Sequence, residues 1–192
     1  MYLGMALWPI AVYAGARYDR FTTSGRIEQH TPPTFVADYP ERSEGQLSPK
    51  LAAVAALGRA ATLRLSYGEG FRAPTLLDLY SRSVAPGPSA GAPVVTEPAP
   101  DLAAERVKSL ELGLDATLPM RTRVALSLFA QRLSDLIYRQ RVTPVLNVVA
   151  NAGEAKVDGI EVEISQPLFG DSVRLHATAT HLFRYDITRN EA

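Results

Sequence analysis

The chain has 192 residues, with 20 basic and 20 acidic side chains, so its formal net charge at neutral pH is zero. A balanced charge argues against a nucleic-acid-binding protein, which needs a basic excess to neutralise phosphates. The absence of cysteine excludes disulfides, cysteine-ligated zinc and a thiol nucleophile. Since no run of 18 apolar residues is present, the sequence predicts no membrane-spanning helix.

The first sixteen residues permit two interpretations. They are apolar and end in Ala14-Gly15-Ala16, which resembles a signal-peptidase site. However, no Lys or Arg precedes the apolar run, and Trp8-Pro9 is unusual inside a signal peptide. The alternative is a strand over 7–21, whose even-numbered side chains from Trp8 to Tyr18 share one apolar face. A chain that starts inside a strand is expected to be a fragment.

Apolar and polar residues alternate with period two along most of the chain, which is typical of strands with two different surroundings. In one such stretch Leu110, Leu112 and Leu114 alternate with Glu111 and Gly113. The sequence shows no credible helix. We predict seven strands, over residues 7–21, 46–57, 60–71, 105–118, 121–138, 154–166 and 172–185.

The connections between these strands alternate in length. The short ones span 57–60, 118–121 and 167–171, and the long ones span 22–45, 81–103 and 139–152, the last with room for some extended structure. Short turns at one end and long loops at the other are typical of up-and-down outer-membrane barrels. The fold class predicted is therefore all-β: an antiparallel up-and-down sheet of about seven long strands, forming a partial segment of a large transmembrane β-barrel.

The first predicted strand has the dimensions of a membrane crossing. Trp8 and Tyr18 lie ten residues apart on its apolar face, and no charged residue of that face lies between them. At roughly 3.3 Å per residue and a tilt of about 45°, they are on the order of 23 Å apart across a membrane. A barrel needs an apolar band about 25 Å tall between two aromatic girdles.

The opposite face of the predicted strands carries charge, as the water-filled lumen of a barrel would require. A soluble β-sandwich shows the same alternation, so it remains an alternative at this level. The candidate lumen-facing residues are Arg17, Asp19, Arg64, Glu111, Asp115, Glu161, Glu163 and Arg174.

Three stretches resemble the C-terminal barrel of TonB-dependent outer-membrane receptors. Residues 66–80 resemble the family's Phe-Arg-Ala-Pro segment and its Leu-x-Glu-Leu-Tyr-like tail, with Asp78 in the acidic place. Residues 100–105 and 110–113 resemble Asn-Pro-Asp-Leu-Lys-Pro-Glu leading into Glu-x-Gly, although Ala99 replaces the Asn and Ala103-Ala104 replaces Lys-Pro. Residues 151–161 resemble Asn-x-Gly-x-Ala-x-x-x-Gly-Val-Glu. The three stretches occur in the family's order and spacing.

This resemblance implies a barrel of about 22 strands that is closed by an N-terminal plug. The plug and the remaining strands would lie outside residues 1–192, which would be one partial barrel domain. Such receptors lie in the outer membrane of Gram-negative bacteria and import a metal chelate, a ferric siderophore or a cobalamin-like molecule. The expected partners are the lipid bilayer, the chelate and the TonB complex, which acts through the plug. No enzymatic activity, cofactor or nucleic acid is expected.

The segment Phe71, Arg72, Ala73 and Pro74 is the candidate plug-facing site. Pro74 lacks a backbone N–H and therefore ends strand pairing, so the segment is expected to be a strand terminus packed on the plug. A direct ligand contact by Arg72 is the less favoured alternative. The ligand-binding residues are unknown from sequence, although the long loops 22–45 and 81–103 are the expected location.

No catalytic or metal-binding residues are predicted. His176 and His181 are five residues apart on one strand and point to opposite faces, so they cannot share an ion. Glu161 and Glu163 are expected to pair with cations such as Arg174 or Arg64 rather than to perform acid–base chemistry. The alternatives to a receptor are a passive porin, a soluble all-β binding module and a membrane β-barrel hydrolase.

Overall fold

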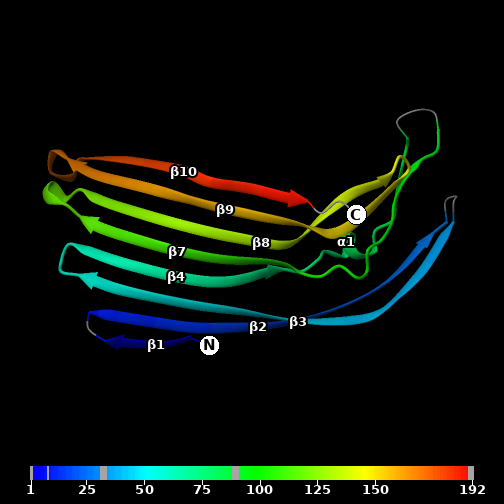
Figure 1. Ribbon diagram of the computed structural model, residues 1–192, viewed down its shortest axis with the longest axis horizontal. Helices are drawn as coiled ribbons and strands as arrows, with labels where there is room; N and C mark the ends of the chain where they lie inside the picture. Colours follow the sequence, from blue (N-terminus) through cyan, green and yellow to red (C-terminus); the bar gives the residue numbers. More distant parts are fainter. Residues whose placement is uncertain (1, 8, 31–33, 88–90, 190–192) are drawn as a thin grey trace.

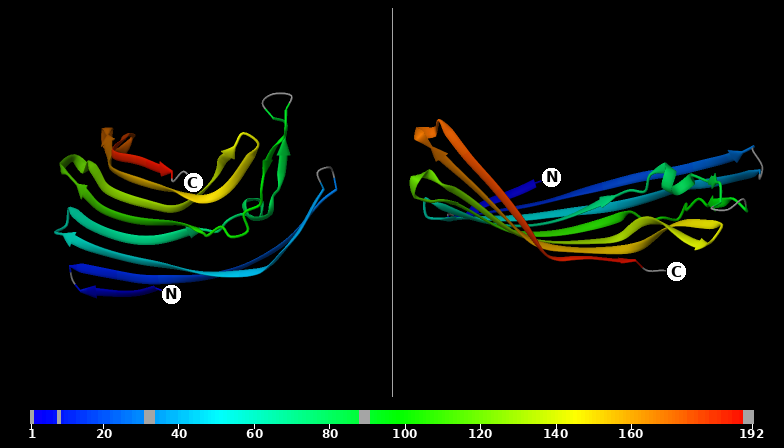
Figure 2. Two further views of the ribbon diagram at one scale, coloured as in Figure 1. Left: turned by 45° about the vertical axis from the view of Figure 1, so that its right-hand side comes forward. Right: turned by 90° about the horizontal axis from the view of Figure 1, so that it is seen from above.

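A computed structural model describes residues 2–7, 9–30, 34–87 and 91–189. Within these ranges the chain forms one curled sheet of ten strands, which the views in Figure 1 and Figure 2 show as an open, trough-like wall. The predicted all-β fold class and the long up-and-down strands are confirmed. No helix in the described ranges is long and apolar enough to cross a membrane.

The sheet order is β1-β2-β3-β4-β7-β8-β9-β6-β5, and β10 pairs with β9 beside the β6 segment. The long strands pair antiparallel with their neighbours, whereas β6 pairs in parallel with β9, so the sheet is mixed rather than purely antiparallel. The elements are β1 (Tyr2–Leu7), β2 (Ile10–Gln29), β3 (Phe35–Leu57), β4 (Ala61–Arg72), α1 (Leu76–Tyr80), β5 (Ser83–Ala85), β6 (Val94–Thr96), β7 (Glu105–Thr117), β8 (Arg123–Thr143), β9 (Leu146–Leu168) and β10 (Val173–Arg189).

The predicted long loop over 22–45 is wrong, and the extended structure left open within 139–152 extends over most of that segment. Residues 22–45 continue β2 and β3 into one long hairpin, and residues 139–152 similarly continue β8 and β9. Both hairpins project at the end of the sheet opposite the short turns (Figure 1). Half-buried and exposed side chains still alternate along the β2–β3 hairpin, but its half-buried face mixes polar with apolar residues, so the period of two is not visible as an alternation of hydrophobicity.

The predicted strand over 7–21 also differs, because β1 ends at Leu7 and β2 begins at Ile10. The strands predicted over 60–71, 105–118 and 172–185 correspond closely to β4, β7 and β10. The prediction for 81–103 missed β5 and β6, which pair with each other in this segment.

The absence of a predicted helix is wrong at residues 76–80, where α1 follows β4. The Thr75 side chain accepts a hydrogen bond from the Asp78 backbone N–H at 3.2 Å, and the Asp78 carboxylate accepts one from the Thr75 N–H at 3.0 Å. This reciprocal capping box satisfies two backbone donors that a five-residue helix would otherwise leave open. The Thr-x-x-Asp spacing directly after Pro74 was the sequence signal for it.

The two faces of the sheet meet different surroundings. One face is apolar, and its large side chains remain exposed: Leu110 is 48% exposed, Leu112 40% and Leu128 40%. The other face carries the charged residues and several hollows. We assign this face to the concave side of the curled sheet that Figure 2 shows. The small buried core lies elsewhere, where α1 meets the segment before β7, and it contains Leu79, Leu102 and Ala104.

Of the two aromatic residues predicted to flank the apolar band of the first strand, the structure describes one. Tyr18 lies on the apolar face and is 66% exposed, as an interfacial tyrosine would be. Trp8 lies outside the described residues.

Candidate functional site

The three stretches singled out in the sequence meet beyond the ends of β4 and β7. Arg72, at the end of β4, is paired by register with Glu105, the first residue of β7. Its guanidinium forms a two-pronged ion pair with the Glu105 carboxylate, with both N···O distances at 2.6 Å. The same carboxylate accepts a hydrogen bond from the Ile137 N–H at 2.8 Å, which ties β8 into the contact.

Asn151 completes this junction from β9. Its side-chain amide donates to the carbonyl oxygens of Ala103 at 3.0 Å and Asp135 at 2.7 Å, and its oxygen accepts from the Ala103 N–H at 2.8 Å. Asp135 lies at a bulge in β8 and has a positive φ of 57°. Arg72, Glu105 and Asn151 therefore form a motif junction that holds irregular backbone in place.

The ion pair shifts the pKa values of both Arg72 and Glu105, which lie beyond the apolar band of the sheet. The hydrogen bond from Arg72 lowers the pKa of Glu105, and the Ile137 N–H acts in the same direction, against the opposing effect of burial. The same hydrogen bond raises the pKa of Arg72. Glu105 is only 15% exposed and Arg72 is 53% exposed, so the carboxylate is the buried member of the pair.

The remaining residues of the candidate plug-facing segment have different environments. Phe71 stacks on Phe21 of β2 with the ring centroids 6.2 Å apart. Ala73 is half-buried and Pro74 is buried. The guanidinium of Arg72 binds Glu105 and therefore joins β4 to β7. That this segment faces a plug stays a prediction.

Above the motif junction, a small outer cap is built from α1, the β2–β3 hairpin and residues 94–102. Arg82 is 9% exposed at its side chain, lies 4.7 Å above the Phe35 ring, and hydrogen-bonds Glu97 and Gln29. Arg42 donates to the carbonyl oxygens of Pro100 at 2.8 Å and Leu102 at 3.1 Å. The two arginines therefore fix the chain segments of this cap to the long hairpin.

The eight candidate lumen residues all lie on the concave polar face by the register of the strands. Arg17 pairs with Asp19 at 2.7 Å, and Arg64 pairs with Asp115 at 2.7 Å. Glu111 accepts a hydrogen bond from Ser127 at 3.3 Å. That this face bounds a water-filled lumen stays a prediction.

The expected pairing of Glu161 and Glu163 with Arg64 or Arg174 is wrong. Arg64 is taken by Asp115, and Glu163 lies 3.7 Å from the His176 ring. The register explains this result, because Thr178 is directly opposite Glu163 and His176 lies diagonally across the same face, whereas Arg174 is one further step away.

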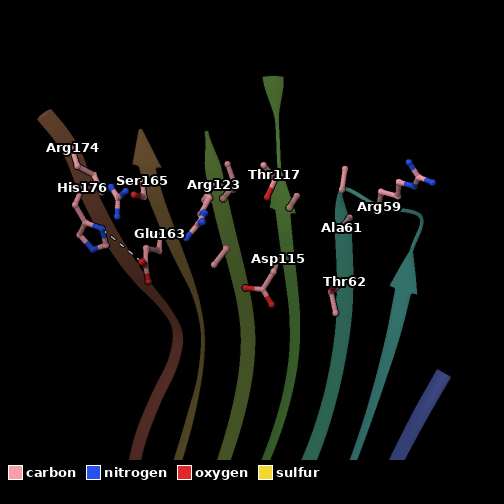
Figure 3. Close-up of a pocket in the computed structure, with 14 residues that line it drawn as sticks. Arg59, Ala61, Thr62, Asp115, Thr117, Arg123, Glu163, Ser165, Arg174 and His176 are labelled. Carbon is pink, nitrogen blue, oxygen red and sulfur yellow. Dashed lines mark ion pairs between the residues drawn. The ribbon is translucent and has the colours of Figure 1, made fainter. Parts of the chain in front are cut away.

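A hollow of about 540 Å³ lies on the polar face beside the short turns. Figure 3 shows Arg59, Arg123, Arg174 and His176 around it, with Asp115 and Glu163 deeper along the strands. Among the described residues, no ion pair joins Arg59, Arg123 or Arg174 to an acid. The arginines therefore give this wet hollow free cationic donors that suit carboxylates or other anionic groups. Sequence analysis identified only Arg174 of these three, because Arg59 and Arg123 lie at turn boundaries.

Within the described ranges, no group of three His, Asp or Glu side chains is placed to hold a metal ion. His176 faces the polar hollow. His181 packs edge-on against Phe183 at 5.5 Å, on the same strand.

An exposed apolar face, a charged concave face and projecting hairpins at one end define the wall of a large transmembrane β-barrel. The chain matches the model of the TonB dependent receptor-like β-barrel family over residues 4–191. The chain therefore belongs to this family.

Solved structures support the same fold. The chain is similar to the Serratia marcescens hemophore receptor HasR, solved with its hemophore HasA and heme, with a TM-score of 0.71 and 18% identity over 91% of this chain and 32% of that one. It is similar to the copper transporter OprC, with a TM-score of 0.70 and 17% identity over 94% and 28% of the respective chains. It is also similar to the FrpB iron transporter of Neisseria meningitidis, with a TM-score of 0.63 and 19% identity over 96% and 25%.

The chain thus spans about a third or less of each of these three structures. No curated protein matches its sequence. At these identities, the structural similarity establishes the fold, and the family comes from the match over residues 4–191.

Proposed function

We propose that this chain is part of the barrel wall of an outer-membrane receptor that imports a metal chelate with energy from the TonB system in a Gram-negative bacterium. The family match over residues 4–191 carries this proposal. The physical support is the two-faced sheet, because lipid satisfies an exposed apolar face and a wet interior satisfies a charged one. A soluble sandwich would instead cover the apolar face with a second sheet.

The rest of the barrel and a plug would come from residues outside this chain. The sheet has β1 at one edge and β10 at the other, each paired on one side only. A lipid bilayer offers no partners for such open edges, so they need further strands. The concave face, with Arg72 at its outer end and the arginine-lined hollow at the short-turn end, would then pack against a plug through charged and polar contacts.

The ligand class rests on related structures. The similar structures named above are a hemophore receptor bound to its hemophore and heme, a copper transporter and an iron transporter, and the chain is also similar to the Pseudomonas aeruginosa ferric enterobactin receptor PfeA, with a TM-score of 0.63 and 16% identity. Metals and their chelates are common to all of them. The outer cap and the two projecting hairpins are the parts of this chain that would contact such a ligand, because recognition loops on a rigid scaffold carry specificity.

Uptake by the full receptor tests the proposal. We expect a strain lacking the gene to lose accumulation of one member of a panel containing heme, ferric enterobactin, another ferric siderophore, cobalamin and copper. The full-length gene should restore it, and a protonophore should abolish the restored uptake. Protonophore-insensitive passage of small sugars and chelates alike would instead show a passive porin and contradict the proposal.

A further inference from the structure

A row of charged residues crosses the apolar, outward-facing side of the sheet. By strand register, Lys108 of β7 is directly opposite Arg132 of β8, which is directly opposite Lys156 of β9. Glu69 of β4 and Asp186 of β10 lie at the two ends of this row. Three cations therefore occupy consecutive strands at one level, an arrangement that is destabilising unless an anion lies between them.

The acids near this row neutralise it only in part. Glu69 lies 3.7 Å from Lys108, and Asp158 binds both Arg132 and Arg184, the latter at 3.3 Å. Asp186 is 3.5 Å from Arg184. Among the described residues, no ion pair engages Lys156 or the neighbouring Arg106 of β7. The outer basic row, with its flanking residues, thus has five cations and four carboxylates: Arg106, Lys108, Arg132, Lys156 and Arg184 against Glu69, Glu154, Asp158 and Asp186.

A bulge in β10 contributes to this arrangement. The register shifts between Leu182 and Arg184, so Arg184 is opposite Asp158 and Asp186 is opposite Lys156. Without the extra residue, the following side chains would alternate to the other face. The bulge therefore places two charged side chains of β10 on the outward face, beside the basic row.

The row lies immediately beside the exposed apolar band. On β7 the outward side chains change from Leu112 and Leu110 to Lys108 and Arg106, and on β8 from Leu128 and Ala130 to Arg132. The change occurs on the side of the sheet away from the short turns. If lipid covers the apolar side chains, then the cations directly beyond them lie at the level of the headgroups.

We infer that the outer basic row binds phosphate groups on the headgroups of outer-leaflet lipids. This inference rests on the proposed outer-membrane location. Charge complementarity supports it, because Lys108, Arg132 and Lys156 form a line of donors that bridging phosphates would relieve of mutual repulsion. Continuity supports it too, since the same lipid would cover Leu110 and Leu112 with its acyl chains and place its headgroup against the cations.

Native mass spectrometry of the full-length receptor in detergent tests this inference. The probes are lipid A with two phosphates, lipid A with one phosphate, and phosphatidylethanolamine. The variant Lys108→Gln/Lys156→Gln removes two cations and leaves the Arg132–Asp158 pair intact. The matched control, Arg17→Gln/Lys50→Gln, removes two cations from the concave face away from the arginine-lined hollow. The heat-dependent shift in gel mobility shows whether each barrel is folded.

We expect the folded outer-row variant to bind the bisphosphorylated lipid about thirtyfold more weakly than the wild type, because it loses two basic residues at roughly 1 kcal/mol each near an anionic surface. The concave-face control should bind like the wild type, and removal of one phosphate from the lipid should weaken binding. Equal lipid retention by the wild type and both variants would overturn the inference. Displacement of the lipid by inorganic phosphate at equal concentration would also overturn it, by showing a site for the free anion.

The two proposals fail separately. A receptor that transports no chelate but retains bisphosphorylated lipid through Lys108 and Lys156 would refute the transport proposal alone. A receptor that transports a chelate while binding lipid independently of these lysines would refute the lipid inference alone. If the outer-row variant does not fold, then Lys156→Gln alone provides the test, because no ion pair in the described structure depends on that side chain.

Discussion

At the scale of single residues, the motif junction turns three sequence resemblances into contacts. Arg72 binds Glu105 through two hydrogen bonds, and Glu105 also accepts the Ile137 N–H. The sequence placed Arg72 at the end of a strand but could not identify its partner, because Glu105 is 33 positions away. The pair depends on the register between β4 and β7, which alternation alone does not specify.

The lowered pKa of Glu105 predicts a pH-dependent stability. A carboxyl group with a lowered pKa in the folded state contributes stability above its unfolded-state pKa of about 4.3, and loses this contribution as the pH falls through the folded-state value. We expect Glu105→Gln to reduce stability at neutral pH by on the order of 1 kcal/mol, because Arg72 is half exposed.

Thermal unfolding of the full receptor between about pH 3 and pH 8 measures this effect. The difference between wild type and Glu105→Gln should shrink as the pH falls below about 4. Asp38→Asn is the control, since Asp38 is an exposed acid on the β2–β3 hairpin with a 3.6 Å contact to Arg26. A difference at Glu105 that stays constant over this pH range would contradict the assignment.

Asn151 gives a second prediction at this scale. Its amide donates to two carbonyl groups and accepts from one N–H. Asn151→Asp keeps the acceptor but removes both donors, and it sets a negative charge against two carbonyl oxygens. We expect it to destabilise the receptor at neutral pH by about 1–3 kcal/mol. Denaturant unfolding measures the loss, and a variant as stable as the wild type would show that these hydrogen bonds are dispensable.

At the scale of elements, the strands with one apolar face could be predicted from the sequence, and the strand segments with a mixed polar and apolar face could not. β4, β7 and β10 have one apolar side, so period two identified them. Residues 22–45 and 139–152 are largely strand, but the half-buried side of the β2–β3 hairpin mixes polar with apolar residues, so the sequence resembles a loop. α1 was missed for another reason: five residues are too few to show helical periodicity, and only its capping box marks it.

Docking of α1 depends on one glycine. A side-chain carbon added at Gly25 of β2 would lie 2.8 Å from Cγ of Tyr80, the last residue of α1, and the three nearest atoms all belong to that ring. Tyr80 in turn packs against Tyr39 at 5.1 Å between centroids. The close approach of the ring to the β2 backbone therefore requires the absence of a side chain at this position.

We expect Gly25→Val to destabilise the outer cap by about 1–3 kcal/mol in the wild type, through overpacking against the ring. In the Tyr80→Ala background the same substitution should be nearly neutral, because the clashing ring is absent. Limited proteolysis of the segment between α1 and β7 in folded receptor measures opening of the cap. Equal effects of Gly25→Val in both backgrounds would show that the two residues are not coupled.

At the scale of the whole molecule, the sequence predicted the two faces and the family, and the structure added the cation-rich hollow and the outer basic row. Both additions combine residues from three or more strands. Their members are far apart in sequence, and only the strand register brings them to one level. The described residues of the outer cap and hairpins form no cluster of side chains that identifies one chelate. The uptake experiment therefore identifies the ligand.

The central claim is that one face of this sheet meets lipid and the other meets water. Spin labels can be placed at single introduced cysteines along 109–115 of β7 in the full receptor, with any cysteine outside residues 1–192 replaced, since these 192 residues contain none. The labelled receptor is reconstituted into liposomes. Accessibility to oxygen and to a water-soluble nickel reagent is then measured at each position. We predict a period of two, with oxygen favoured at Leu110, Leu112 and Leu114 and nickel at Ser109, Glu111 and Asp115. Equal nickel accessibility at both sets of positions would contradict the claim.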